Sequence, residues 1–320
     1  MIDQLCGERK LFNSNNDIGE KNLENIVVMT LDKGKQGPQY MSTDLTVNEE
    51  KSKVRTKEMI KDIEKFKKIR TCSRIVGIGL KTLHGDKRYY QSGIVKKGNS
   101  WYVTEFNTGY TVFEIEHHKG IVDFNNPKEI YTLSTPFIGN NHAISPTTDD
   151  FFYITDDGTY LTKFNLKSLT SGSIKKFPII KDNINIYSQV NGTSAIHVDS
   201  GYAWLVYNKD QNNHLTISRI DKNNLEEIRR IKLNKFDRKI SSSFISCGIF
   251  YGIECAGIQC RILPIYDLIH GKYVLRKDKF NVVGHWNSYG NIKSVSYDSV
   301  THMLAILDDD KIYSIQLKVL

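Results

Sequence analysis

Residues 241–251 have the sequence Ser-Ser-Ser-Phe-Ile-Ser-Cys-Gly-Ile-Phe-Tyr, and this stretch indicates the kind of fold that the chain adopts. Its alternating apolar residues are typical of a buried strand, and the glycine forms a turn into a second strand that begins with Phe-Tyr. Cys247 lies at its centre. A buried strand rarely needs a thiol for packing alone, which raises the question of a second cysteine within bonding reach. Cys72 is the best candidate, because it stands just before the first strand-like segment.

The same strand, turn and strand unit recurs along the chain at intervals of about 50 residues. Strand centres lie at residues 101–103, 152–154, 204–206, 250–252 and 304–306, with second strands at 111–115, 162–166, 217–221, 263–267 and 312–315. β-Propeller blades have this signature, because each small sheet must stack on its neighbours to bury its faces. We therefore predict an all-β domain, a five-bladed β-propeller. Weaker strand signals at 193–197 and 293–296 are predicted to be innermost strands that line the axial channel.

The charge of the chain is concentrated in one segment. Residues 51–70 contain nine Lys or Arg and three acidic residues, so most of the net charge of +8 lies there. The rest is nearly balanced, which argues against nucleic-acid binding by the domain. No apolar run is long enough to span a membrane, and residues 1–16 lack the apolar core of a signal peptide. The protein is then either cytosolic or lacks an export signal in this sequence.

The amino-terminal part is predicted to lie outside the propeller, which we place at residues 72–318. Residues 1–46 are polar and Asn-rich, which favours a flexible arm. Within it, residues 34–39 form two Gly-X-Y triplets, either a simple turn or the remnant of a collagen stalk. Residues 47–70 have the apolar spacing of a short amphipathic helix, which either packs on the domain or forms a coiled-coil seam. Such a segment could also join copies of the chain into a homo-oligomer.

Three segments resemble the olfactomedin-domain family. Residues 243–251, preceded by the basic pair Arg238-Lys239, are similar to a family segment in which Lys-Arg-Ser leads into Ala-Phe-Ile-Cys-Gly-Leu-Tyr. Residues 201–226 are similar to its Gly-Leu-Trp strand and the Val-Ser-Lys-Leu-Asp-Pro stretch that follows. Residues 295–315 resemble its closing segment, and the whole resemblance extends from about residue 72 to residue 317.

The resemblance implies a secreted five-bladed propeller with a clasp disulfide at Cys72 and Cys247. A loop of about 175 residues closed by that bond would contribute roughly 5 kcal/mol in the chain-entropy model. The family also implies a non-catalytic adhesion or signalling module that binds an extracellular or cell-surface protein. We therefore expect a protein partner, no cofactor and no enzymatic activity.

The chain departs from this family at the calcium site. The family holds Ca²⁺ in its channel through side-chain and backbone oxygens. Its two aspartates align with Ala195 and Ser296, and its asparagine aligns with Ser242. Neutral hydroxyls cannot balance a divalent charge in a low-dielectric channel, so we predict that no calcium binds there. Asp199 is the nearest carboxylate that could compensate.

The other cysteines and a sequon leave alternatives open. Cys255 and Cys260 either form a local disulfide across a loop, remain free thiols or form half of a metal site, although no Cys or His pair at zinc spacing accompanies them. Cys6 is either free or links two chains. Asn191 begins an Asn-Gly-Thr sequon, which is a glycosylation site only if the protein is exported.

Two other functions compete with the extracellular one. A five-bladed glycoside hydrolase would use paired carboxylates, but the acidic clusters at residues 149–150, 156–157 and 308–310 are predicted to lie at turns. The adjacent His117 and His118 would point to opposite faces of a strand and cannot chelate one ion together. A cytosolic scaffold propeller is favoured by the missing signal and predicts reduced thiols.

Overall fold

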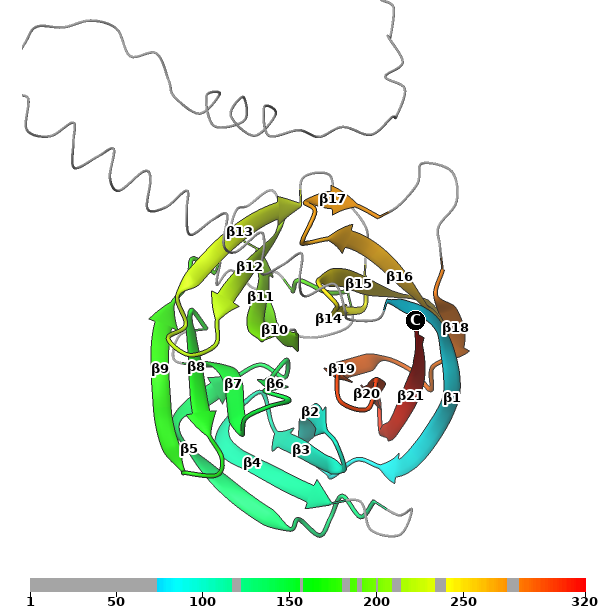
Figure 1. The fold of residues 1–320 in the computed structure, drawn as a ribbon. Helices are drawn as coiled ribbons and strands as arrows, with labels where there is room; N and C mark the ends of the chain where they lie inside the picture. Colours follow the sequence, from blue (N-terminus) through cyan, green and yellow to red (C-terminus); the bar gives the residue numbers. More distant parts are fainter. Residues whose placement is uncertain are drawn as a thin grey trace, which may run out of the picture. The chain divides into compact units, whose positions relative to one another are not determined.

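The computed structural model describes residues 74–116, 122–155, 158–179, 185–188, 192–199, 201–208, 214–233, 240–274 and 282–320. These residues form antiparallel β-sheets and contain no α-helix, which confirms the predicted all-β class. The sheets surround a common axis in a propeller-like arrangement (Figure 1). The predicted arm at 1–46 and helix at 47–70 lie outside the described residues. Within the described part, no helix could cross a membrane.

Two sheets follow the chain in simple order. The first contains β10 (Ser194–Asp199), β11 (Tyr202–Asn208), β12 (Leu215–Asp221) and β13 (Glu227–Leu233). The second contains β14 (Ser242–Ser246), β15 (Ile249–Ala256), β16 (Gln259–Asp267) and β17 (Lys272–Tyr273), and β18 (Gly284–Asn287) also pairs with β16. From β10 to β13 and from β14 to β17 each strand pairs with the next along the chain, because short turns favour antiparallel neighbours.

The largest sheet joins two such groups. One group is β2 (Gln91–Lys97), β3 (Ser100–Glu105), β4 (Thr108–Glu116) and β5 (Glu129–Ile138), and the other is β6 (Ala143–Ile144), β7 (Asp150–Thr155), β8 (Tyr160–Asn165) and β9 (Thr170–Lys176). The groups meet through β5 and β7, whose register contains the single pair Phe137 and Thr155. The eight-stranded sheet is therefore two four-stranded units with a narrow connection.

The last sheet combines both ends of the described domain. β1 (Ile75–Asp86) pairs with β21 (Lys311–Val319), which continues through β20 (Met303–Asp308) to β19 (Ile292–Asp298). The register extends from Ile75 opposite Val319 to Asp86 opposite Lys311. Strand pairing thus joins the two ends of the described domain through backbone hydrogen bonds.

The predicted repeat strands are present. Every strand centre inferred from the repeat lies in an observed strand, from residues 101–103 in β3 to residues 304–306 in β20. The core lies between the faces of neighbouring sheets: Ile94 and Trp101 from β2 and β3 pack with Ala305 and Leu307 of β20. This stacking is why the hydrophobic repeat extends over the whole domain.

The innermost strands β2, β6, β10, β14 and β19 contact one another around the axis (Figure 1). Two contacts between them repeat. The amide of Gly98, in the turn after β2, donates to Asp298 Oδ2 of β19 at 2.9 Å, and the amide of Gly248, in the turn after β14, donates to Asp199 Oδ2 of β10 at 2.8 Å. Both glycines have a positive φ, 56° and 66°. A carboxylate at the end of one inner strand therefore fixes the turn of the next sheet.

A ladder of side chains joins β19 to β2. Ser294 Oγ accepts from the Ile94 amide at 3.2 Å, and Ser296 Oγ accepts from the Lys96 amide at 3.4 Å. Alternate residues of a strand share one face, so Ser294, Ser296 and Asp298 accept in turn from two amides of β2 and from the amide of the turn that follows it. The serine at the family calcium position thus satisfies a buried backbone donor.

Candidate functional site

A cavity of about 20 Å³ lies between the innermost strands. Its polar lining residues are Lys96, His142, His197, Ser296 and Tyr297, and the others are aliphatic. They come from β2, from the residue before β6, from β10 and from β19. The structure therefore brings Ser296 to the axial cavity, whereas Ala195 and Ser242 are buried on β10 and β14 and do not line it.

Lys96 brings a positive charge to this cavity. Its ammonium lies 3.7 Å from Asp298 Oδ2 and donates to the Gly98 carbonyl. Burial lowers the pKa of Lys96, and the attraction of Asp298 opposes that shift. Both side chains are almost fully buried, at 7% and 2% exposure. The pair is therefore a buried ion pair, in which removal of either partner leaves a charge in a poorly hydrated site.

The two histidines of the cavity differ in their partners. His197 Nε2 lies 3.1 Å from Ser243 Oγ, and Ser243 also bonds to the hydroxyl of Tyr187. Neither ring nitrogen of His142 has a hydrogen-bond partner in the described structure. Its ring instead packs against the aromatic rings of Phe137 and Phe151, at centroid distances of 5.1 and 5.4 Å. Burial lowers the pKa of each histidine to about 3, so both imidazoles are neutral near pH 7.

These residues do not fit a calcium ion. The hydroxyl of Ser296 accepts from the Lys96 amide, Lys96 is among the lining residues and carries a positive charge paired with Asp298, and no carboxylate lines the cavity. Asp199, the carboxylate expected to compensate, accepts from the Gly248 amide. Ca²⁺ requires six to eight oxygen ligands with enough negative charge, and a fixed ammonium would repel it.

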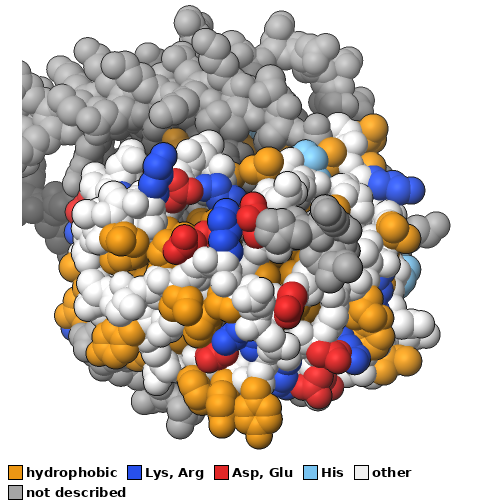
Figure 2. Space-filling model, turned by 90° about the horizontal axis from the view of Figure 1, so that it is seen from below, with side chains coloured by type: hydrophobic (Ala, Val, Ile, Leu, Met, Phe, Trp, Pro, Cys, Tyr) orange, Lys and Arg blue, Asp and Glu red, His pale blue; other side chains and the backbone are white. Residues whose placement is uncertain are grey.

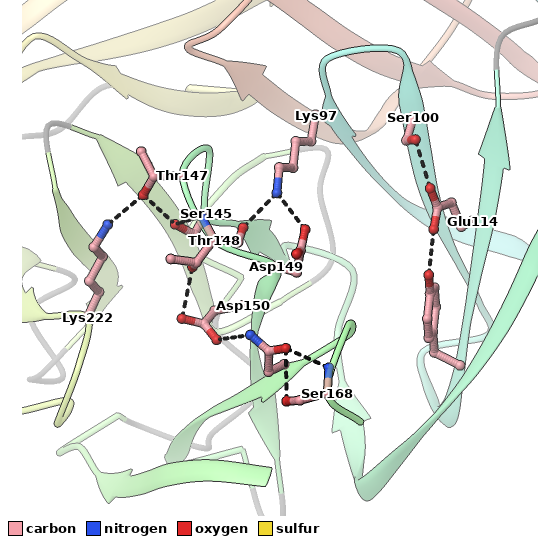
Figure 3. Close-up of polar contacts among 12 residues, drawn as sticks. Lys97, Ser100, Glu114, Ser145, Thr147, Thr148, Asp149, Asp150, Ser168 and Lys222 are labelled. Atoms are coloured by element: carbon pink, nitrogen blue, oxygen red, sulfur yellow. Dashed lines mark hydrogen bonds and ion pairs between the residues drawn. The ribbon is translucent and has the colours of Figure 1, made fainter. Parts of the chain in front are cut away.

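Of the acidic pair expected at a turn, Asp149 directly precedes β7 and Asp150 is the first residue of that strand, and their carboxylates have different partners (Figure 3). Asp149 Oδ1 pairs with Lys97 Nζ at 2.8 Å, and the same ammonium donates to the Thr148 carbonyl at 2.7 Å. Asp150 accepts from Thr148 Oγ1 and from Asn165 Nδ2, each at 2.9 Å. The two carboxylates hold a loop in place and link it to the end of β2.

The acidic cluster at residues 308–310 differs from the prediction. Asp308, expected at a turn, is the last residue of β20 and is fully buried. It accepts from the amides of Tyr289 and Gly290 at 2.7 and 2.8 Å and from the Tyr313 hydroxyl at 2.9 Å. The expectation was wrong for this residue because a buried carboxylate with three donors is as stable in a strand as at a turn. Residues 117–118 and 156–157 lie outside the described residues.

The cysteines lie on the β14 to β16 sheet. Cys255 and Cys260 form a disulfide between β15 and β16, with 4.1 Å between their Cα atoms. Cys247 is also disulfide-bonded and has a positive φ of 53° in the turn after β14. Cys72, Cys6 and Asn191 lie outside the described residues, so the clasp pairing and the glycosylation remain predictions.

A surface feature that the sequence analysis missed is an exposed aromatic cluster of Tyr89, Tyr90 and Phe106. Their exposed fractions are 83%, 53% and 53%. Tyr90 stacks on Phe106 with 4.5 Å between centroids, and Tyr89 stands perpendicular to Tyr90 at the same distance. Two consecutive aromatics beside the polar run at residues 85–88 were the signal that could have identified it. Figure 2 shows hydrophobic side chains spread over the face in view, among side chains of both charges.

The backbone beneath the cluster holds these rings outward. Phe106 has a φ of 63°, in the left-handed region, and its amide donates to the Tyr90 carbonyl at 2.8 Å. Arg88 lies below, where it pairs with Glu105 at 2.7 Å, donates to the Phe124 carbonyl at 2.9 Å and covers the ring of Phe113. A bulky residue at positive φ is strained, and such strain is concentrated at functional sites.

The chain matches a known family over most of its length. Residues 51–319 match the sequence model of the olfactomedin-like domain, and a search of curated proteins finds no match. Among solved structures, glutaminyl cyclase from Myxococcus xanthus is similar over 78% of this chain and 97% of its own, with 10% identity and a TM-score of 0.46. Hydrazine synthase from Kuenenia stuttgartiensis is similar over 69% of this chain and 56% of its own, with 14% identity and a TM-score of 0.41. At these TM-scores neither likeness carries an argument about function.

Proposed function

Because the chain belongs to the olfactomedin-like domain family, we propose that it is an extracellular protein-binding module that acts without catalysis and without a bound calcium ion. The proposal includes a five-bladed propeller as the scaffold. It is supported by the narrow connection at Phe137 and Thr155, which divides the eight-stranded sheet into two four-stranded units. In the same proposal, loops at the rim of the ring present the binding residues, and the inner strands hold them in fixed positions.

The exposed aromatic cluster is the observation that carries this function. Tyr and Trp are enriched at the energetic centres of protein interfaces, because they bury a large area with little loss of side-chain entropy. Tyr89 and Tyr90 meet at 90°, which forms a corner between two side chains that are 83% and 53% exposed. Full burial of one such side chain contributes roughly 1.5–3 kcal/mol. A partner that inserts an apolar side chain into this corner would gain most of its affinity there.

The charges beside the cluster favour a protein partner. Lys87 pairs with Asp310 at 3.0 Å, Lys311 pairs with Asp86, and Arg88 pairs with Glu105 at 2.7 Å. Each of these three cations is thus already paired with a carboxylate. Nucleic acid and anionic lipid would require unpaired cations. An apolar centre within a charge-balanced rim is instead the arrangement of a protein interface.

The test measures binding of the full chain, produced by a secretory host, to a panel of cultured cells. We expect saturable binding that is lost after protease treatment of the cells. The double variant Tyr89→Ser, Tyr90→Ser is expected to bind at least ~10-fold more weakly. Ile174→Ser is the matched control, because Ile174 of β9 has the same 53% exposure as Tyr90. Equal binding by the aromatic variant, or binding that resists the protease, would contradict the proposal.

Two further measurements test the environment that this function requires. A non-reducing peptide map is expected to show a linked Cys72 and Cys247 pair, and free thiols in a well-folded protein would favour an intracellular scaffold instead. Added Ca²⁺ is expected to leave the thermal midpoint equal to that in a chelator. Stabilisation by Ca²⁺ that a substitution of Ser296 abolishes would show that the calcium site is present.

A further inference from the structure

The axial cavity is polar but has no unbalanced charge. The charge of Lys96 is balanced by the buried Asp298, whose Oδ2 atom lies 3.7 Å from the ammonium. His142 and His197 are neutral near pH 7, because burial lowers the pKa of each to about 3. The remaining polar groups of the lining are two hydroxyls. The cavity therefore favours a neutral ligand that both donates and accepts hydrogen bonds.

His142 is the lining residue whose hydrogen bonds are not accounted for. It is 4% exposed, and neither of its ring nitrogens has a partner in the described structure. The ring is held in place, because Phe137 and Phe151 pack against it. A neutral imidazole has one donor and one acceptor, and leaving both unpaired in the interior raises the free energy of the folded state. In native proteins such a group usually contacts an ordered water.

Ser296 brings a second hydrogen-bonding group to the same cavity. Its Oγ atom accepts from the Lys96 amide at 3.4 Å, and no contact of the described residues uses its hydroxyl proton. A hydroxyl can accept one bond and donate another at the same time. Ser296 belongs to β19, whereas His142 directly precedes β6, and the described structure contains no direct hydrogen bond between them.

We propose that the axial cavity binds one fixed water molecule, which forms hydrogen bonds with a ring nitrogen of His142 and with the hydroxyl of Ser296. The cavity measures about 20 Å³, and a polar cavity above about 10–15 Å³ holds one water, whereas cavities that stay dry are apolar. Water suits either tautomer of the imidazole, because it can donate or accept. Ca²⁺ would require carboxylate ligands, which the lining lacks.

The water has a structural role at the axis. It connects β19 to the segment before β6, which are strands of two different sheets. A hydrogen bond through a fixed water is nearly as favourable as a direct one. His142 and Ser296 are therefore energetically coupled although they do not contact each other directly, and their coupling is measurable.

Crystals of the unaltered full chain, grown once with Ca²⁺ and once with a chelator, test the site directly. We expect the same single peak in both, at hydrogen-bonding distances of about 2.7–3.2 Å from a His142 nitrogen and from Ser296 Oγ. A cavity without a peak would overturn the proposal. So would a peak that appears only with Ca²⁺ and lies about 2.3–2.6 Å from its ligands.

Urea unfolding tests the coupling in solution. His142→Leu and Ser296→Ala each remove one partner of the water, so the unfolding constant of the double variant is expected to be about 5-fold smaller than the two single effects predict when multiplied. The control cycle combines His142→Leu with Ser314→Ala, since Ser314 is also a buried strand serine but does not line the cavity. We expect the control effects to multiply. Independent effects of His142→Leu and Ser296→Ala would contradict the shared water, and the crystals decide the matter if a variant fails to fold.

Discussion

Acidification tests whether the two histidines at the axis of the propeller are buried and neutral. His142 and His197 are buried at the axis, and burial lowers the pKa of each to about 3. Unfolding exposes both rings and returns their pKa to about 6.5. Between these values the unfolded chain binds more protons than the folded one, so the free energy of unfolding decreases as the pH falls from about 6.5 towards 3.

The magnitude follows from the same two values. At pH 5, a histidine with an unfolded pKa of about 6.5 that stays neutral in the folded protein lowers the free energy of unfolding by about 2 kcal/mol relative to pH 8. Two independent histidines lower it by about 4 kcal/mol, a large part of the 5–15 kcal/mol typical of a domain. Substitution of the two histidines isolates their contribution from that of other groups.

The assay is urea unfolding at pH 8 and pH 5, for the parent protein and for His142→Leu combined with His197→Gln. Glutamine keeps a donor for Ser243, which contacts His197 at 3.1 Å. The double variant is expected to lose about 4 kcal/mol less than the parent between the two pH values. His285→Gln, at an exposed position, should leave the pH dependence unchanged. Identical pH dependence in the parent and the double variant would refute the assignment of both rings as buried and neutral.

Three further predictions concern stability, measured as the urea midpoint. Asp298→Asn breaks the buried pair with Lys96 and should cost about 3 kcal/mol, whereas Glu226→Gln in the exposed pair with Lys175 should cost less than about 1 kcal/mol. Gly248→Ala should lower the free energy of unfolding more than Gly257→Ala. Both glycines have a positive φ, but a Cβ at residue 248 would lie 2.6 Å from Ile269 Cδ1, whereas a Cβ at residue 257 would meet nothing within 4 Å. Equal losses of stability would contradict this prediction. Replacing Cys255 and Cys260 by Ser removes the bond that closes a short loop between two strands, and it should lower the free energy of unfolding by about 2 kcal/mol. An unchanged midpoint would show that the disulfide does not restrict the unfolded chain.

Much of the fold could be predicted because the repeat is a local pattern. Each unit places apolar residues in consecutive strands, and the burial of Tyr102, Tyr153 and Leu205 reflects the need of each sheet to cover its neighbour. The pairing of β1 with β21 could not be predicted in the same way. Residues 75–86 are mostly half-exposed, so their sequence carries a weak strand pattern, and the partner lies more than 200 positions away.

The candidate sites were harder to predict, because they depend on which side chains meet across strands. That Ser296 departs from the family stays a prediction, and its contact with the Lys96 amide follows only from the alignment of β19 beside β2. The position of His142 at the cavity could not be predicted, because a single histidine before a short strand is common in sequences. The aromatic cluster could have been predicted in part, from the consecutive residues Tyr89 and Tyr90. Phe106 joins the cluster from a turn between other strands, which the sequence pattern does not indicate.

Ser296, at the family calcium position, and the buried pair of Lys96 and Asp298 belong to one network of contacts. In the family, a metal cation supplies positive charge in the channel and carboxylates supply the negative charge. In this chain Lys96 supplies a fixed positive charge beside the cavity, and the carboxylate that balances it, Asp298, also accepts from the Gly98 amide. A carboxylate in place of Ser296 would disturb the ladder that satisfies the β2 amides. The ammonium, the serine ladder and the Asp298 contact therefore depend on one another, and together they join the first and last sheets of the ring.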